Sequence, residues 1–257
     1  MEKIYLIFPG YPVNGGAPAV AVWAIVALRQ KFDVYVVGYF NWPLDELNSF
    51  FGTDLKMGDF TTVRAFGSGR INQLVSRMPR TLNHCLLSWW VKRNVHDDFC
   101  VSMCGEFDFG RPGIQYIHFP FFSDGNVSTY EQASIGCRDT VIRRFYRKVC
   151  ERLSGWSLDS IKSNHTVCNS NFTAEVTHRA YGIDPDVLYP PVYVENFPEV
   201  PWGDRADDVV MLGRMVPYKN QDFGIKVVEQ LRARGYLADL HLVGRWGNDD
   251  KYNARVK

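Results

Sequence analysis

The stretch that decides the fold is Lys3-Ile4-Tyr5-Leu6-Ile7-Phe8, a compact and mainly apolar run at the start of the chain. A loop rich in glycine and proline follows over residues 10–16. Residues 17–30 are apolar and rich in alanine, and Pro18 suits the first turn of a helix. A second apolar run spans residues 33–39. Strand, loop, helix and strand in this order predict a parallel sheet with a crossover helix, and therefore an α/β fold.

The same alternation continues to about residue 180. Apolar runs predict further strands over residues 61–66, 99–103, 114–119 and 166–169. Helical patterns cover residues 71–93, broken near Pro79, as well as residues 140–153 and 170–180, the last with Ser170 or Asn171 as its cap.

A polar segment with two prolines and a glycine, residues 198–208, is typical of a linker between domains. After it the order restarts, with a strand over 209–212, a loop over 213–219, a helix over 222–234 and a strand over 239–243. The predicted domains are therefore 1–197 and 208–257, joined by a linker over 198–207. One strand-helix-strand unit cannot bury both faces of a parallel sheet, so we expect the second domain to be incomplete and to expose apolar surface.

Composition excludes several classes of protein. The formal net charge is +1, which argues against a nucleic-acid partner, and no run approaches the roughly 18 apolar residues of a membrane span. The N-terminus lacks the features of a secretion signal, so a cytoplasmic location is expected. The six cysteines include no Cys-x-x-Cys pair, so we expect reduced, buried thiols and neither a zinc ribbon nor a thioredoxin-like site.

Three segments carry candidate chemistry. Gly15-Gly16-Ala17 lies between the first strand and the first helix, where paired glycines allow a phosphate to approach a helix N-terminus, although a tight turn without ligand is equally open. His118 lies at the end of the 114–119 run, at the edge of an open sheet where ligands bind, although a purely structural histidine is also possible. Arg214 and Lys219 flank a loop after a strand, where they could clamp a diphosphate or be solvated.

In order and spacing, these segments resemble glycosyltransferase family 4. The matching pieces are Gly15-Gly16-Ala17, Tyr116-Ile117-His118, Asn169-Ser170-Asn171-Phe172-Thr173, Tyr189-Pro190-Pro191-Val192, and Gly213-Arg214 with Pro217-Tyr218-Lys219-Asn220. The resemblance implies a GT-B fold, in which two Rossmann-like domains face each other, and retaining transfer of a hexose from a nucleotide-diphosphate sugar. Some pieces are similar to the family's mannosyltransferases that extend lipid-linked oligosaccharides.

The resemblance also implies roles. Gly15, Gly16, Gly213, Arg214 and Lys219 would bind the donor; Arg214 and Lys219 would stabilise the leaving diphosphate, and His118 would act at the reacting centre. The partners would be the donor and a saccharide or lipid-linked acceptor. Neither a cofactor nor a metal is expected, because GT-B enzymes generally need no bound metal.

Two departures from the family pattern bear on activity. Pro18 stands where the family usually has an acidic residue, and no two glutamates in the chain are eight positions apart, as the family's donor-binding pair is. We therefore expect this chain by itself to be inactive. A nucleotide-sugar epimerase of GT-B fold and a non-catalytic binding remnant remain as alternatives.

The predicted helix over residues 140–153 has a basic side, with Arg143, Arg144, Arg147, Lys148 and Arg152. A solvated helix face explains this pattern, and so does peripheral contact with an anionic membrane, to which Trp89, Trp90, Lys92 and Arg93 could contribute. The sequence leaves both interpretations open.

Overall fold

The computed structural model describes residues 1–12, 15–96, 98–122, 141–195, 197–247 and 249–256. These residues form two compact units, one up to Val194 and the other from Glu195 onwards, and each is described by itself. The predicted strands and helices of the N-terminal part are present, and its α/β class is confirmed.

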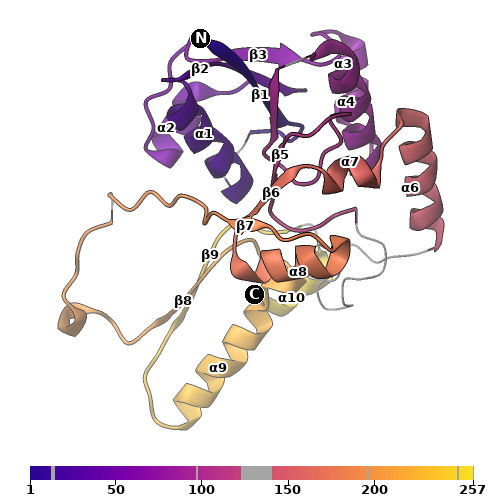
Figure 1. The fold of residues 1–257 in the computed structure, drawn as a ribbon. Coiled ribbons are helices and arrows are strands. Elements are labelled where there is room, and N and C mark those ends of the chain that lie inside the picture. The colour runs from indigo at the N-terminus through magenta and orange to yellow at the C-terminus, as the bar shows by residue number, and fades with distance from the viewer. Residues whose placement is uncertain (13–14, 97, 123–140, 196, 248, 257) are drawn as a thin grey trace. The chain divides into compact units, whose positions relative to one another are not determined.

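The first unit is built on a seven-stranded parallel sheet in the order β3-β2-β1-β4-β5-β6-β7 (Figure 1). Its strands are β1 (Glu2–Phe8), β2 (Phe32–Gly38), β3 (Thr61–Arg64), β4 (Phe99–Ser102), β5 (Ile114–Ile117), β6 (His165–Cys168) and β7 (Asp186–Val187). β1 pairs with β2 along its whole length, from Glu2 opposite Phe32 to Phe8 opposite Gly38, and with β4 on its other edge. The decisive apolar run is therefore an interior strand, paired on both edges.

The helices of this unit are α1 (Gly16–Leu28), α2 (Leu44–Phe51), α3 (Arg70–Ser76), α4 (Arg80–Asn94), α6 (Val141–Ser154), α7 (Leu158–Lys162) and α8 (Asn171–Tyr181). The predicted break near Pro79 separates α3 from α4. Ser170 is the N-cap of α8, and its hydroxyl accepts a hydrogen bond from Thr173 N at 3.2 Å. The sequence analysis missed α2 and α7, which are only eight and five residues long.

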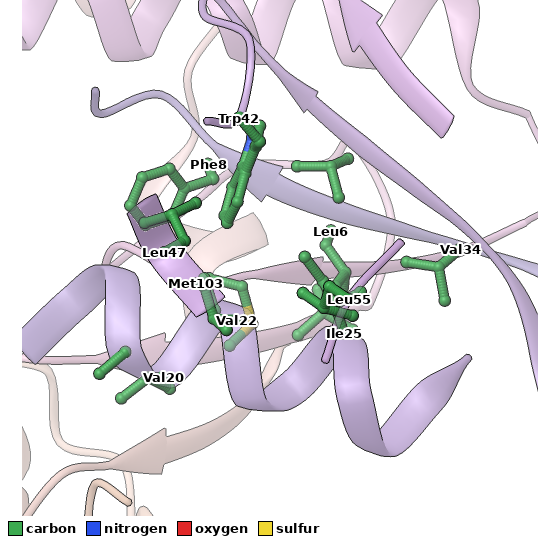
Figure 2. Close-up of a cluster of buried hydrophobic side chains, with 14 of the residues drawn as sticks. Leu6, Phe8, Val20, Val22, Ile25, Val34, Trp42, Leu47, Leu55 and Met103 are labelled. Carbon is green, nitrogen blue, oxygen red and sulfur yellow. The ribbon is translucent and has the colours of Figure 1, made fainter. Parts of the chain in front are cut away.

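Both faces of the sheet are covered, as a parallel sheet requires. On one face, Ile4, Leu6 and Phe8 of β1 pack against α1 and α2, in the cluster that Figure 2 shows in close-up. On the other face, Ile7 packs with Leu87 and Val91 of α4. Alternate residues of one strand thus build two separate cores, which is why β1 reads as a continuous apolar run.

The second unit has a two-stranded parallel sheet of β8 (Val209–Leu212) and β9 (Leu240–Val243), joined by α9 (Gln221–Ala233) and followed by α10 (Asp250–Val256). One-turn 3₁₀ helices lie at Trp202–Asp204, within the predicted linker, and at Pro217–Lys219. Leu212 of β8 is 82% exposed and Leu237 is 95% exposed. The expected exposure of apolar surface is therefore observed in the described part of this unit.

None of the described helices is both long enough and apolar enough to cross a bilayer. Of the cysteines, Cys85, Cys100, Cys104, Cys150 and Cys168 are free thiols and, except for the half-buried Cys104, are buried. Cys137 lies outside the described residues.

A glycine at the end of β2 provides the first test of this architecture. A Cβ on Gly38 would lie 2.3 Å from the carbonyl oxygen of Phe8, at the end of β1. We expect Gly38→Ala to lower the free energy of unfolding by about 2 kcal/mol, because the main chain of β1 cannot move aside without disturbing both cores. Urea unfolding of the whole chain measures this. Gly16→Ala is the matched control, since its Cβ would meet no atom within 4 Å in the part of the chain that the structure describes. An equal loss in both variants would contradict the argument.

Candidate functional site

The first part of the candidate site lies at the carboxyl edge of the seven-stranded sheet. β1 is flanked by β2 on one side and β4 on the other, so the chain leaves this strand in one direction and later returns on the opposite side. In open α/β sheets, ligands bind beyond the carboxyl ends of the strands at such a switch point. Gly15, Gly16 and His118 all come from segments that follow strands of this sheet.

His118 follows β5 directly and is held by its neighbours. Its Nε2 donates to the carbonyl oxygen of Met103, just after β4, at 3.1 Å. Its own carbonyl accepts a hydrogen bond from Asn169 Nδ2, just after β6, at 3.1 Å. The ends of three adjacent strands therefore hold this residue in place. The sequence analysis quoted Asn169 within a motif but assigned it no role.

The protonation state of His118 follows from this geometry. Burial lowers its pKa, the hydrogen bond to Met103 opposes that effect, and the nearby Arg80 guanidinium adds to the lowering. The imidazole is therefore neutral at pH 7, with its proton on Nε2, because a carbonyl can only accept. Nδ1 is then a hydrogen-bond acceptor, which suits a sugar hydroxyl and would not attract a phosphate.

A buried carboxylate that the sequence analysis missed orders the loop after His118. Glu106 is 1% exposed, and its Oε1 accepts hydrogen bonds from the amides of Phe121 at 2.5 Å and Phe122 at 3.2 Å. The phenol of Tyr181, at the end of α8, donates to the same oxygen. Burial, followed by the charge of Glu106, raises the pKa of Tyr181 well above its usual value. The sequence signal was available, since acids alternate with buried phenylalanines over residues 106–109.

The Gly15-Gly16 segment forms the start of α1. Gly15 is the N-cap and its carbonyl accepts the first intrahelical bond, from Ala19 N at 3.0 Å. The amides of Gly16 and Ala17 precede that bond and so have no acceptor within the helix. A Cβ on Gly16 would meet no atom of the described residues within 4 Å, so packing in that part of the unit does not explain the glycine. Open space in front of helix N–H groups is what an anionic ligand needs.

The second part of the site is the loop after β8, in the second unit. Gly213 and Gly244 follow β8 and β9 with the same φ of 153°, which favours glycine. A Cβ on Gly244 would lie 1.9 Å from the Gly213 carbonyl oxygen, so the two backbones touch. The contact continues beyond the strands, since Met215 N donates to Arg245 O at 2.9 Å. This extended pairing gives the 213–219 loop a defined conformation.

Within this loop, Tyr218 brings the two candidate cations together. Arg214 Nη2 donates to the Tyr218 hydroxyl at 2.8 Å, and Lys219 Nζ lies 5.9 Å from the centre of the Tyr218 ring. The Lys219 methylenes also lie over Gly213, 3.8 Å from where a Cβ would stand. Both cations are exposed, and among the described residues no carboxylate pairs with either. The loop therefore presents two positive charges that are not neutralised by the part of the unit described.

The loop is anchored to the start of α9. Gln221 is 2% exposed, and its Nε2 donates to the Arg214 carbonyl at 2.8 Å. Its backbone N donates to the hydroxyl of Tyr252, from α10, at 2.9 Å, and that hydroxyl donates to Gln221 Oε1 at 2.7 Å. Between loop and helix, Asn220 has φ 56°, a conformation that asparagine tolerates better than most residues.

The sequence contains one Asp-x-Asp, Asp184-Pro185-Asp186, which the sequence analysis overlooked. Its carboxylates diverge: Asp184 pairs with His178 at 2.9 Å and Asp186 with His165 at 3.1 Å. No group of three or more His, Cys, Asp or Glu side chains suited to a metal ion occurs in the described residues. The pair therefore does not form a metal centre within the described part of the chain.

Each unit thus brings together its own group of the predicted site residues. Gly15, Gly16 and His118 share the carboxyl edge of the first sheet, and Gly213, Arg214 and Lys219 share one loop of the second unit. The first unit is a Rossmann-like domain, and the second unit begins with the same order of strand, loop, helix and strand. GT-B glycosyltransferases are built from two such domains.

Comparisons with known proteins agree with that class. Over 136 residues, 47% of this chain and 32% of the relative, the sequence is 29% identical to the human alpha-1,3/1,6-mannosyltransferase ALG2. No family model matches. The fold is similar to that of WaaG, a glycosyltransferase involved in lipopolysaccharide biosynthesis, with a TM-score of 0.56 and 14% identity over 98% of this chain and 66% of that one. A glycosyltransferase from Rickettsia africae ESF-5 aligns with a TM-score of 0.51 and 13% identity over 100% and 64% of the two chains.

These similarities confirm the resemblance to GT-B glycosyltransferases. The chain spans less than two thirds of WaaG and of the Rickettsia enzyme, and the matched region about a third of the human mannosyltransferase. The identities with the two solved structures are low, so these structures speak for the fold alone.

A buried histidine beside the site generates a prediction about pH. His84 of α4 is 5% exposed, and burial, with a contribution from Arg80, lowers its pKa to about 3. Because the unfolded chain binds a proton near pH 6.5 while the folded chain does not, the free energy of unfolding falls as pH drops below 6.5. Between pH 7 and about pH 5.5, we expect the free energy of unfolding to fall by about 1 kcal/mol less in His84→Gln than in the native protein.

Urea unfolding at the two pH values measures this difference. His96→Gln is the control, since it removes an exposed histidine instead of a buried one. Parallel pH profiles for the native protein and His84→Gln would show that His84 is not responsible.

Proposed function

We propose that the whole protein is a retaining glycosyltransferase that moves a hexose from a nucleotide-diphosphate sugar to a saccharide or lipid-linked acceptor. The observation that carries this is the 213–219 loop, which sets two exposed cations beyond the carboxyl end of a parallel strand. The sequence similarity to a mannosyltransferase supports the same reaction class and favours mannose as the sugar. No observation favours an epimerase.

The chemical difficulty in such a reaction is the departure of a nucleoside diphosphate, on which negative charge develops. Arg214 would contact that diphosphate through a planar fork, and Lys219 through a compact point charge. The hydrogen bond from Arg214 to Tyr218 limits the positions that the guanidinium can take, so less freedom is lost when the ligand binds. Cations positioned in advance stabilise charge more effectively in the transition state than in the ground state.

The first unit would contribute binding and positioning. The amides at the start of α1 would approach an anionic group, and Gly16 leaves the space that this approach requires. His118 would accept a hydrogen bond from a sugar hydroxyl through Nδ1, because its Nε2 proton is engaged by Met103. Glu106 would act as a positioning residue by fixing the loop that follows His118. No cofactor is required by these roles, and contact with an anionic membrane would suit a lipid-linked acceptor.

Nucleotide binding to this chain tests the proposed donor loop. We expect GDP and UDP, titrated by calorimetry, to bind through the diphosphate, and Arg214→Ala and Lys219→Ala each to weaken binding at least about tenfold, the effect of losing one charge-assisted contact. Thermal unfolding should hardly change, because both side chains are exposed. Arg234→Ala, which removes an exposed cation beyond the other end of α9, should bind like the native chain.

Two outcomes would count against the donor loop: unchanged nucleotide affinity in both alanine variants, or an equal loss in Arg234→Ala. Transfer by the whole protein is a separate measurement, made with a panel of nucleotide sugars and saccharide acceptors. Inversion at the anomeric carbon of the product would refute the retaining mechanism.

A Tyr218→Phe variant tests the role of Tyr218, which contacts both cations. It removes the hydroxyl that accepts a hydrogen bond from Arg214 but keeps the ring over which Lys219 lies. We expect a loss of nucleotide affinity of about threefold to tenfold, smaller than that of Arg214→Ala, because the guanidinium remains but is less confined. An affinity equal to that of Arg214→Ala would mean that Tyr218 itself binds the ligand.

A further inference from the structure

Helix α6 shows an apolar surface where a helix of a water-soluble protein normally shows a polar one. One side of it packs into the first unit through Cys150, which is buried with Cys85 of α4, and through the buried Ser154. The opposite side leaves Ile142 82% exposed, Phe145 70% exposed and Leu153 76% exposed. These side chains are large and aliphatic or aromatic, and the described residues do not cover them.

The exposed side is organised in two rows. Val141, Phe145, Val149 and Leu153 are spaced four residues apart, so they form one continuous apolar row along the helix. Arg144, Lys148 and Arg152 have the same spacing and form a basic row beside it. The helix therefore presents a buried face, an apolar band and a cationic band in turn around its circumference.

Charge is concentrated in this part of the molecule. Residues 70–94, which include α3 and α4, contain five Lys and Arg residues and no Asp or Glu. Residues 141–154 contain five more and a single acid, Glu151, which lies 3.3 Å from Arg147. These two segments together have a net charge of +9, whereas the whole chain has a net charge of +1. Part of this charge is paired, since Lys92 contacts the buried Asp108 at 2.9 Å and Arg147 contacts Glu151. Lys148 and Arg152, by contrast, are exposed beside the apolar row.

The neighbouring helix extends this surface. α4 packs beside α6, on the side of the sheet away from α1 and α2 (Figure 1). Trp89 lies one turn beyond Cys85, the residue of α4 that is buried against α6, and remains 36% exposed. The Arg93 guanidinium lies over its indole ring, 4.2 Å from the centre. A tryptophan stacked with an arginine suits the boundary between lipid headgroups and acyl chains.

We infer that the exposed side of α6, with Trp89 and Arg93 of α4, is a docking surface for an anionic membrane. The helix would lie parallel to the bilayer, with Phe145 and Leu153 among the acyl chains and Lys148 and Arg152 on the lipid phosphates. The inference does not depend on the proposed glycosyl transfer, since membrane binding needs neither donor nor acceptor.

Other occupants fit these observations less well. A second copy of the chain, docked through the same surface, would bring Lys148 and Arg152 of both copies together. Nucleic acid would match the basic row but would leave the aliphatic row facing a polar backbone. An anionic bilayer satisfies both rows at once, because it offers phosphates and hydrocarbon within a few ångströms of depth.

Vesicle co-sedimentation of the whole chain tests the inference. We expect binding to vesicles of equal parts phosphatidylcholine and phosphatidylglycerol, weakened by salt, and little binding to phosphatidylcholine alone. Lys148→Gln with Arg152→Gln should reduce the partition coefficient about 25-fold, since each cation near the surface contributes about fivefold. Phe145→Ser with Val149→Ser should reduce it at least about tenfold. Circular dichroism should show each variant folded, because these side chains are exposed.

The matched control is Lys31→Gln with Phe50→Ser, which removes one exposed cation and one exposed aromatic from elsewhere in the same unit and should not alter binding. Equal loss in this control, or failure of the native chain to bind anionic vesicles, overturns the inference. A dimer in sedimentation velocity that Phe145→Ser dissociates would assign the surface to a second copy. Binding of a duplex oligonucleotide that depends on Lys148 and Arg152 but not on Phe145 would assign it to nucleic acid.

Discussion

Burial of one strand on both faces is the constraint from which the rest of the first unit follows. β1 pairs with β2 and β4 on its two edges and packs against helices on its two sides, so every direction around it is occupied by protein. A parallel sheet requires such coverage, because its crossover helices must lie against its faces. The same topology brings the loops after β1, β4, β5 and β6 to one edge. The site is therefore a consequence of how the core is built.

Polar groups near that edge are satisfied by a small number of buried side chains. One oxygen of Glu106 accepts hydrogen bonds from two amides and a phenol. Asp108, also 1% exposed, accepts hydrogen bonds from Lys92 Nζ at 2.9 Å and from the Ser157 amide at 2.9 Å. A buried carboxylate without such donors would be costly, and with them it fixes the conformation of these irregular loops. This explains how irregular segments next to His118 are held in place without belonging to the sheet.

The second unit achieves the same end with backbone contact. Gly213 and Gly244 let two post-strand loops approach more closely than any side chain would allow, and Gln221 and Tyr252 then tie the loop to α9 and α10. A loop supported in this way can keep two like charges close to one tyrosine ring without a neutralising carboxylate among the described residues. Such an arrangement is poorly suited to stability and well suited to an anionic ligand.

The sequence by itself determined the α/β class and the position of most strands and helices. It also identified the loops that carry the candidate site residues, those at Gly15-Gly16 and at residues 213–219. It could do so because hydrophobic periodicity and glycine or proline positions are local signals. It did not reveal α2 and α7, which are too short for a periodic pattern, nor the roles of Glu106, Tyr181 and Tyr218. Only the tertiary structure decided these, because they depend on contacts between residues far apart in the chain: Glu106 meets Tyr181 across 75 positions. It also decided which side of α6 faces water, since a helical pattern shows that an apolar row exists and only packing shows whether it is covered.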